Sequence, residues 1–475
     1  MPAKVISPIE VYKYLPKTNC KECGEPNCMA FAVKLVNREI ELNKCTPLLK
    51  EEYKEAYRKL WEMLKPPVKE VEIGVGDKRV KIGGKYVIHR HELTYNNPTA
   101  IAIDISDDMS EEEILRRIKK VQEFRFTYIG TTLKLDMLAL RSVSNDKARF
   151  KEMVTFVANN TDLPLILCSF NPTIMEAGLR VVGDRKPLIY AATKENWREF
   201  LEFASIYKCP LAVFAPNDLK MLGSLTKTLI ENGVSDLVLD PGTVPKGGLA
   251  NTLNAFTMLR WRAINEGDEA LGFPLMGTPI TAWMVMDGDP SLKAWWEACI
   301  ANMLILRFAD LLIMHSLDGW SLLPTMILRQ NIYNDPRKPV SVTPGLRVFG
   351  NPDEYSPVFM TTNFALTFYT VKSDIEAGKV DCYLLVVNSE GIAVECAVAG
   401  RKITPESIAE ELLKSEVDKK VKHRILVIPG KAARLAGAIE DATKLTWKVV
   451  VGPMDSSEIP KFVANEWKRI VQSAQ

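Results

Sequence analysis

The 475-residue sequence contains no uninterrupted apolar run of the roughly 18–20 residues that a membrane-spanning helix needs. Its beginning, MPAKVISPIEVYKYLPKTNC, has neither an apolar core nor a small-residue cleavage site, so we expect no secretory signal peptide. The formal net charge is only +2, which gives no reason to expect nucleic acid or an anionic membrane as the main partner. These absences predict a cytoplasmic protein.

Two further patterns are missing. Neither G-x-G-x-x-G nor G-x-x-x-x-G-K-[ST] occurs, so the common nucleotide-binding motifs are absent. The cysteines number nine, and an odd count without an export signal argues against a disulfide framework. Five of them are scattered through apolar, strand-like runs, and we interpret these five as buried small hydrophobic residues: Cys168, Cys209, Cys299, Cys382 and Cys396.

What is present is the composition of an ordinary globular protein, with 47% hydrophobic and 25% charged residues. At about 100–200 residues per domain, the length predicts two to four domains. An amphipathic helix is predicted over 48–64 as the last element of the first domain. It is expected to end before Pro66 and Pro67, because proline cannot continue a helix. The predicted divisions are a small module at 1–65, a central domain at 66–320, a proline-rich linker at 321–356 and a C-terminal domain at 357–475.

The central domain alternates short apolar runs with helical stretches, after a segment at 71–93 whose alternation predicts strands and hairpins. Near-continuous apolar strands are typical of a parallel sheet covered on both faces. Eight such runs favour a (β/α)8 TIM barrel, with a doubly wound open sheet as the competing fold. The runs begin near residues 100, 133, 163, 186, 209, 236, 274 and 309. Ser110 and Glu113 form a capping box that predicts the start of the first barrel helix.

The strongest motif is a cysteine cluster near the beginning of the chain, with the spacing C-x2-C-x4-C-x16-C. Four thiolates are the usual ligands of a 4Fe–4S cluster, and Gly24 within the motif favours a loop that can wrap one. Structural zinc also takes four thiolates, but usually from two close pairs far apart in sequence. Spacing alone does not settle the metal, although it favours the 4Fe–4S cluster on Cys20, Cys23, Cys28 and Cys45.

A helix is expected after the third of these cysteines, to bring the chain back so that the fourth completes the site. Its apolar face is predicted from the spacing of Met29, Val33, Val36 and Ile40.

The C-terminal domain is predicted to be an α/β sheet. Strands are expected at DCYLLVVNSEG, IAVECAVAG, RILVIPG and WKVVVGP, and Thr404-Pro405-Glu406 opens a helix. Small residues at strand ends, such as Gly391, Gly430 and Gly452, would let backbone N–H groups approach a ligand closely. Ordinary turns would explain the same glycines.

At this point the sequence resembles a known family, the large subunit of the corrinoid/iron–sulfur protein. This is the gamma subunit of the acetyl-CoA decarbonylase/synthase complex. The resemblance spans essentially the whole chain and is carried by NCKECGEPNCMAFAVKLVNREIELNKC, TTNFALTFYTVKSDI, NSEGIAV, HRILVIPGKAARLAGAIED and WKVVVGPMDSSEIP. It implies a 4Fe–4S module, a TIM barrel and a corrinoid-binding α/β domain, in that order.

The resemblance also implies which residues would contact the corrinoid. The sequence lacks the D-x-H-x-x-G signature that supplies a lower axial ligand in other corrinoid modules, and we interpret His423 as a strand histidine. A cobalt without a strong lower ligand is easier to reduce. The implied contacts are Thr361, Thr362, Asn363, Phe364, Ala365, Thr367, Gly430, Ala433, Gly437 and Pro453.

The function implied by the resemblance is that of a methyl carrier. It would transfer a methyl group between N5-methyl-tetrahydropterin and the nickel–iron–sulfur cluster of acetyl-CoA synthase, while the 4Fe–4S cluster reduces Co(II) to Co(I). The implied partners are a smaller TIM-barrel subunit in a heterodimer, and the acetyl-CoA synthase and CO dehydrogenase subunits.

Polar residues at the carboxyl ends of the barrel strands are a separate set of candidates, because barrel enzymes place their chemistry there. They are Asp104, Asn217, Asp240 and His315, and we expect structural roles for them. Two other functions compete with the methyl carrier. One is a zinc-dependent methyltransferase on the barrel, for which only His315 and Cys168 come near a ligand set. The other is an iron–sulfur electron carrier without corrinoid.

Overall fold

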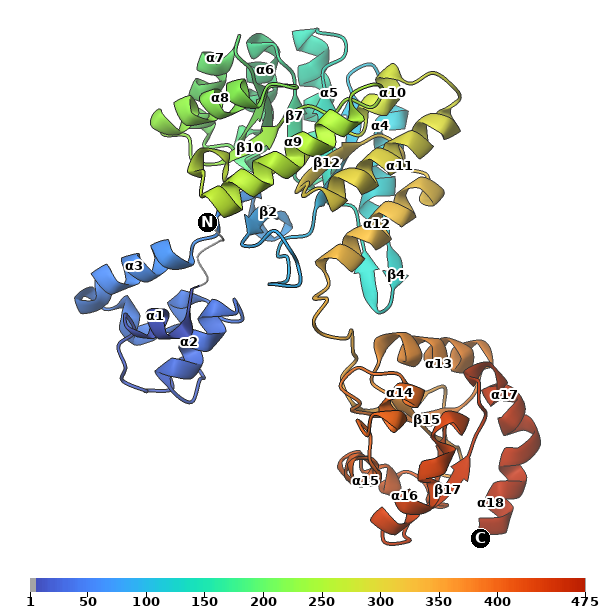
Figure 1. Cartoon of the computed structure of the whole chain (residues 1–475). Helices are drawn as coiled ribbons and strands as arrows, with labels where there is room; N and C mark the ends of the chain where they lie inside the picture. The colour runs from blue at the N-terminus through green and yellow to red at the C-terminus, as the bar shows by residue number, and fades with distance from the viewer. Residues whose placement is uncertain (1–5, 475) are drawn as a thin grey trace. The chain divides into compact units, whose positions relative to one another are not determined.

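The computed structural model describes residues 6–474, which fall into two compact units (Figure 1). The first contains the residues up to Phe126 together with Leu133–Asp335, and the second contains Thr127–Thr132 and the residues from Pro336 onward. The first unit holds both the cysteine module and the barrel. Within residues 6–474, no helix has the combination of length and apolar character required to cross a bilayer.

The cysteine module is built from three helices and short 3-10 turns. Its helices are α1 (Pro8–Tyr12), α2 (Cys28–Val36) and α3 (Lys54–Leu64), and its turns are Leu42–Lys44, Thr46–Leu49 and Glu51–Tyr53. Ser7 and Glu10 form a capping box at the start of α1. The core is apolar and includes Val11, Phe31, Leu48 and Leu60.

Two sequence predictions for this module need correction. The closing helix begins at Lys54 rather than at residue 48, because residues 46–53 form 3-10 turns around Pro47. The buried face of α2 consists of Cys28, Phe31, Ala32 and Leu35, whereas the predicted face residues Met29 and Val33 are 37% and 40% exposed. Cys28 points into the module, and the residues three, four and seven positions later must share its face.

The barrel is closed by eight parallel strands, as the sequence predicts. The strand order is β10-β9-β8-β7-β6-β3-β12-β11, and a parallel bridge between Leu239 and Leu275 joins the two ends. Every predicted run supplies one strand: β3 (Ala100–Ser106), β6 (Met137–Arg141), β7 (Leu165–Cys168), β8 (Leu188–Ala192), β9 (Leu211–Phe214), β10 (Leu237–Asp240), β11 (Met276–Gly277) and β12 (Leu311–Met314).

Helices cover the outside of the barrel, and a hairpin closes its amino end. Ser110 caps α4 by accepting the Glu113 N–H, but the Glu113 carboxylate accepts from Arg116, so only half of the predicted capping box forms. Ile114, Ile118 and Val121 are buried on the inner face of α4. The antiparallel hairpin of β1 (Val68–Ile73) and β2 (Val80–Lys85) packs against the first residues of the barrel strands. The helices are α4 (Glu111–Glu123), α5 (Lys147–Asn160), α6 (Pro172–Val182), α7 (Trp197–Tyr207), α8 (Leu219–Glu231), α9 (Leu249–Trp261), α10 (Thr281–Val285), α11 (Pro290–Leu306) and α12 (Gly319–Tyr333).

Half of the predicted linker at 321–356 is regular structure. Helix α12 includes Pro324, and β13 (Gly345–Phe349) already belongs to the second unit. Pro324 lies inside this helix and removes one i→i−4 hydrogen bond, but the helix continues past it to Tyr333, so this proline does not mark a break. The segment without a helix or strand between these two elements is therefore only residues 334–344. The four-part division of the chain stays a prediction.

The second unit is a five-stranded sheet in the order β13-β15-β14-β16-β17, antiparallel only at β13. The strand predicted at IAVECAVAG is wrong, because this segment forms helix α14 with Val394, Ala397 and Val398 buried at helical spacing. Thr404 caps the predicted helix. The elements are β14 (Val358–Thr362), α13 (Ala365–Ala377), β15 (Cys382–Val387), α14 (Val394–Ala399), α15 (Pro405–Lys414), β16 (Ile425–Ile428), α16 (Ala436–Ala442), β17 (Lys448–Val451), α17 (Ile459–Phe462) and α18 (Lys468–Ala474), with a short hairpin of β4 (Phe126–Tyr128) and β5 (Thr131–Leu133).

Candidate functional site

All four cysteines of the motif line one small pocket in the N-terminal module. Cys28 and Cys45 are buried, Cys23 is half-buried and Cys20 is exposed. Among residues 6–474, no three His, Cys, Asp or Glu side chains converge as the ligands of one metal ion do. A 4Fe–4S cluster distributes its four thiolates over four irons, so its ligands surround a volume instead of meeting at a point.

The backbone of the cysteine loop is held in the form that wraps this pocket. Asn19 accepts the Cys28 N–H at 2.9 Å, and Asn27 caps α2 through the Ala30 N–H. Cys28 is therefore the first residue of α2, where the helix dipole stabilises a thiolate. Gly24 has a φ of +83° and no atom within 4 Å of the position that a Cβ would take, so the loop bends there beside open space.

The donor set fits an iron–sulfur cluster. Burial raises the pKa of the Cys45 thiol, and the neighbouring thiols Cys23, Cys28 and Cys20 raise it further, while a backbone hydrogen bond from Leu48 lowers it. Thiolates that destabilise one another in the free protein are stabilised by the positive charge of bound iron. These four side chains would hold the cluster.

A second site lies at the carboxyl edge of the C-terminal sheet. A cavity of about 400 Å³ opens there between the ends of β14, β16 and β17 and the residues that follow them. This is the edge at which open α/β sheets bind ligands. The Oγ1 atoms of Thr361 and Thr362 are buried without a hydrogen-bond partner, and Thr361 lines the cavity. A buried hydroxyl without a partner is costly, which fits a ligand that would complete it.

The predicted corrinoid contacts fall into three groups. Thr361, Thr367 and Pro453 line the cavity. Gly430 lies beside it, where its N–H donates to the Pro453 carbonyl at 2.9 Å and a Cβ would collide with Met454. The other predicted contacts do not line the cavity: Thr362, Asn363 and Ala365 are buried, Phe364 caps α13, and Ala433 and Gly437 are exposed.

Asn363 has a structural role that the sequence did not reveal. Its Oδ1 accepts hydrogen bonds from the Ser389 N–H, the Ser389 hydroxyl and the Gly391 N–H, at 2.9–3.0 Å. This network joins the loop after β14 to the loop after β15. Asn363 and the NSEG segment at 388–391 therefore form one rim of the sheet edge.

Several cavity residues escaped sequence reasoning because they lie on the segment wrongly predicted as a strand or on the loop after β17. Glu395 and Cys396 of α14 line the cavity, as do Met454 and Asp455. Cys396 is exposed and Cys299 is half-buried, which corrects their interpretation as buried hydrophobic residues. Cys168, Cys209 and Cys382 are buried as expected. The helical spacing of Val394, Ala397 and Val398 was the signal that could have placed α14 at this edge.

His423 is not at the cavity. Its Nε2 donates to the Ser356 carbonyl at 3.0 Å and its Nδ1 accepts the Ile425 N–H at 3.0 Å. Burial lowers its pKa. Both ring nitrogens thus bond to the backbone, which confirms the structural interpretation of this residue.

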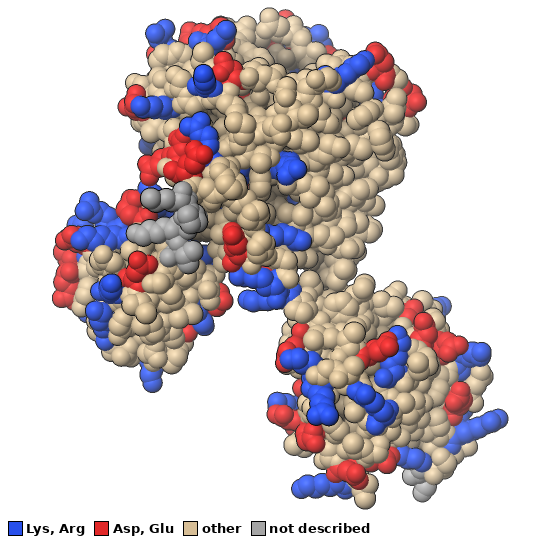
Figure 2. All heavy atoms as spheres, in the orientation of Figure 1, with Lys and Arg blue, Asp and Glu red and all other residues tan. Residues whose placement is uncertain are grey.

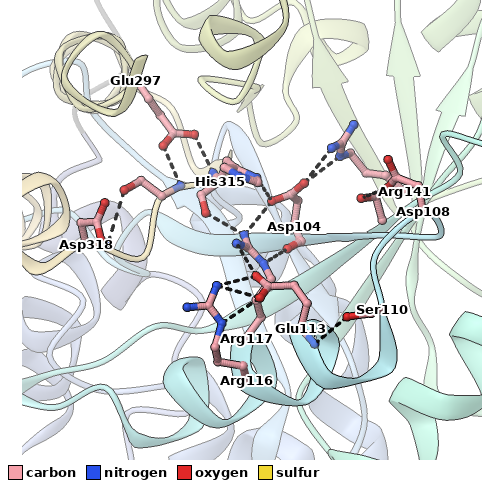
Figure 3. A network of polar contacts seen from close by, with 12 residues as sticks. Asp104, Asp108, Ser110, Glu113, Arg116, Arg117, Arg141, Glu297, His315 and Asp318 are labelled. Atoms are coloured by element: carbon pink, nitrogen blue, oxygen red, sulfur yellow. Dashed lines mark hydrogen bonds and ion pairs between the residues drawn. The ribbon is translucent and has the colours of Figure 1, made fainter. Parts of the chain in front are cut away.

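The barrel candidates Asp104 and His315 belong to a buried ionic network (Figure 3). Asp104 accepts from Arg117 at 2.9 Å, from Arg141 at 2.8 Å and from His315 Nδ1 at 2.7 Å. Burial opposes ionisation of Asp104, but these partners outweigh it and lower its pKa. Glu297 holds the His315 segment by accepting the backbone N–H groups of residues 315 and 316. The network ties β3, β6, α4, α11 and the loop after β12 together.

Asp240 and Asn217 are separate from that network. Asp240 is fully buried, accepts from the Tyr190 hydroxyl at 2.9 Å and from the Gly242 N–H at 2.8 Å, and has its pKa raised by burial to about 7. Asn217 adopts a left-handed turn with a φ of 58°. That these two residues have structural roles stays a prediction.

Comparison with known proteins gives near full-length matches. The chain is 47% identical over 468 residues to acetyl-CoA decarbonylase/synthase complex subunit gamma 1 of Methanosarcina thermophila, covering 98% of this chain and 99% of that protein. It is 45% identical over 470 residues to the gamma subunit of Archaeoglobus fulgidus, at the same coverage. The chain belongs to the acetyl-CoA decarbonylase/synthase gamma-subunit family.

Two family models also match the chain. One, described as "CO dehydrogenase/acetyl-CoA synthase delta subunit", matches residues 70–463. The other, described as "Putative Fe-S cluster", matches residues 15–47 and so includes all four cysteines of the pocket. Among solved structures, dihydropteroate synthase of Thermus thermophilus aligns with 55% of this chain and 100% of its own, at 15% identity and a TM-score of 0.38.

Proposed function

We propose that this chain is a corrinoid/iron–sulfur methyl carrier, which transfers a methyl group between an N5-methyl-tetrahydropterin and the nickel–iron–sulfur cluster of an acetyl-CoA synthase. When bound, the corrinoid cobalt would carry the methyl group and the 4Fe–4S cluster would supply the electron that returns Co(II) to Co(I). The observation that supports the proposal is the presence of two chemically different pockets on one chain: one is lined by four thiols, and the other is a larger cavity beside a buried hydroxyl without a partner.

The cavity's own residues support binding of a large, mostly apolar ligand with polar edges. Its lining is mainly aliphatic, including Leu366, Val371, Val394 and Ile459. The buried Thr361 hydroxyl would form one hydrogen bond with the ligand, and Met454 packs against the backbone of Gly430 where a Cβ would collide with it. Apolar walls with a few placed polar groups are typical of cofactor sites.

We further propose that the partners are other subunits of an acetyl-CoA decarbonylase/synthase complex, including a smaller barrel subunit. The relatives at 45–47% identity are named as subunits of such a complex. A broad area over α11 and α12 carries very few charged side chains (Figure 2). Exposed apolar side chains gather on these helices and on α9, which is unusual unless a partner covers them: Met258, Trp261, Leu292, Trp295, Leu306 and Trp320. The cytoplasmic location expected from the sequence is part of the same proposal.

The visible spectrum of anaerobically purified protein tests the proposal. Corrinoid bands together with broad iron–sulfur absorption are expected. Iron–sulfur absorption alone would instead support an electron carrier without corrinoid, and the absence of both would support neither. The heterodimer is tested separately by native mass of the protein as isolated from its producing cells.

A further inference from the structure

The four thiols of the cysteine pocket differ in their access to solvent. Cys28 and Cys45 are buried and Cys23 is half-buried, whereas Cys20 is exposed. Cys20 lies in a surface loop whose residues Asn19 and Lys21 both have left-handed backbone conformations, with φ values of 50° and 65°. A cluster held by these thiols would therefore come nearest to solvent at Cys20.

Two exposed lysines flank this cysteine in the same loop. Neither Lys17 nor Lys21 forms an ion pair within residues 6–474, and Lys17 instead places its Nζ 5.6 Å from the centre of the Tyr12 ring. Of the nearby carboxylates, Glu25 is buried against Lys34 at 2.6 Å, whereas Glu22 is exposed, accepts from the Thr46 hydroxyl and keeps its negative charge. Two lysines against this one carboxylate leave the loop around Cys20 with a net positive charge.

We propose that this Cys20 edge is the docking surface for a small acidic one-electron carrier protein, guided by Lys17 and Lys21. The inference rests on the proposed function, because it requires the cluster. One electron leaves the reduced carrier and enters the oxidised cluster, with no bond made or broken and no proton transferred. Four thiolates make a bound cluster site negative and would repel an acidic protein, so lysines beside the exposed ligand offset that repulsion.

The experiment measures the rate at which the oxidised cluster is reduced in anaerobically purified full-length protein. Two probes of opposite charge are used: a reduced acidic ferredoxin and reduced methyl viologen, which is a cation. The test variants are Lys17→Glu and Lys21→Glu, alone and combined. The matched control is Lys54→Glu, which reverses an exposed charge on α3, a helix that carries none of the four cysteines.

At low ionic strength we expect the double variant to slow reduction by ferredoxin about 10-fold or more, and not to slow reduction by methyl viologen. Lys54→Glu should leave the ferredoxin rate within about twofold, and added salt should reduce the difference between the double variant and the unmodified protein. Equal ferredoxin rates in the double variant and the unmodified protein would overturn the proposal. So would equal slowing with both probes, because that result indicates damage to the cluster.

A second measurement needs no substitution. In the unmodified protein, salt should slow reduction by ferredoxin and not slow reduction by methyl viologen; a ferredoxin rate independent of salt would contradict the docking surface. The iron content of the protein distinguishes an incorrect docking surface from an incorrect proposed function. If the protein holds the cluster but its charges do not matter, only the docking surface is wrong, whereas a protein without iron contradicts the proposed function itself.

Discussion

The Asp104 carboxylate at the carboxyl end of the barrel and the Thr361 hydroxyl at the carboxyl edge of the C-terminal sheet are both buried, but they differ in their hydrogen-bond partners. In the barrel, Asp104 has no exposed surface and is bonded to two arginines and a histidine. In the sheet, the Thr361 hydroxyl is equally buried but has no partner. Polar groups satisfied by the chain itself stabilise a fold, whereas an unsatisfied group beside a cavity indicates a ligand. We therefore expect the Asp104 network to stabilise the barrel, and we expect a ligand to bind at the sheet edge.

The largest expected effect concerns the cysteine pocket. We expect Cys20→Ala to abolish reductive reactivation of the corrinoid while sparing methyl transfer from protein that has been chemically reduced beforehand, because only the route of the electron is lost. Single-turnover transfer measures this. Cys299→Ala, which removes a thiol from α11, is the control and should retain both activities. Loss of transfer from the pre-reduced Cys20→Ala protein would contradict the separation of electron delivery from methyl transfer.

Next in size is the ionic network of the barrel. Asp104→Asn leaves Arg117 and Arg141 without their carboxylate, and should lower the free energy of unfolding by about 3–5 kcal/mol. The corrinoid spectrum of the folded variant should not change. Denaturant unfolding provides the measurement, with Asp287→Asn as a control within about 0.5 kcal/mol, because the Asp287 side chain is 98% exposed. A variant of normal stability but without corrinoid would reverse the assignment of the two regions.

A third prediction uses pH. The pKa of Asp240 is about 7 in the folded chain against an ordinary 3.8, so the folded state binds more protons between these values. Stability should therefore fall as pH rises from about 4 to about 7, and Asp240→Asn should remove part of this slope, on the order of 1–3 kcal/mol. Asp104 has the opposite effect, because its pKa is lowered in the folded chain. Its contribution to stability is lost as pH falls and the carboxylate becomes protonated. A slope unchanged in Asp240→Asn would contradict the account of Asp240.

The smallest effect is expected at the sheet edge. Thr361→Val keeps the shape of the side chain and removes a hydroxyl that has no partner in the corrinoid-free chain. Stability of that chain should not decrease, while retention of corrinoid should weaken about fivefold, the loss of one hydrogen bond of about 1 kcal/mol. Thr370→Val on the same cavity is a useful comparison, because the Thr370 hydroxyl already donates to the Leu366 carbonyl at 2.9 Å. Unchanged corrinoid retention in Thr361→Val would contradict a hydrogen bond between this hydroxyl and the corrinoid.

The parts of this molecule that sequence predicts are those that depend on local pattern. All eight barrel strands follow from apolar runs, and the Ser110 and Thr404 caps follow from residues three or fewer positions away. The cysteine pocket was predictable because its motif lies within 26 residues and only a compact loop can gather it.

The rest depends on contacts between distant residues. Asp104 and His315 are 211 positions apart, and nothing in either segment indicates that they meet. The α14 segment has residues that suit a strand, but packing selects the helix that buries Val394, Ala397 and Val398. The helix places Glu395 and Cys396 at the cavity, so the incorrect strand prediction also left these two residues out of the predicted site.

The central claim is that one chain serves two metal cofactors, with different chemistry at each. Iron and cobalt analysis of the chain with its smaller barrel subunit, isolated without oxygen and separated from the iron-containing synthase and dehydrogenase subunits, tests this most directly. The account predicts about four irons and about one cobalt for each copy of the chain. Iron without cobalt would contradict the carrier role of the C-terminal cavity, and the absence of both metals would contradict the whole account.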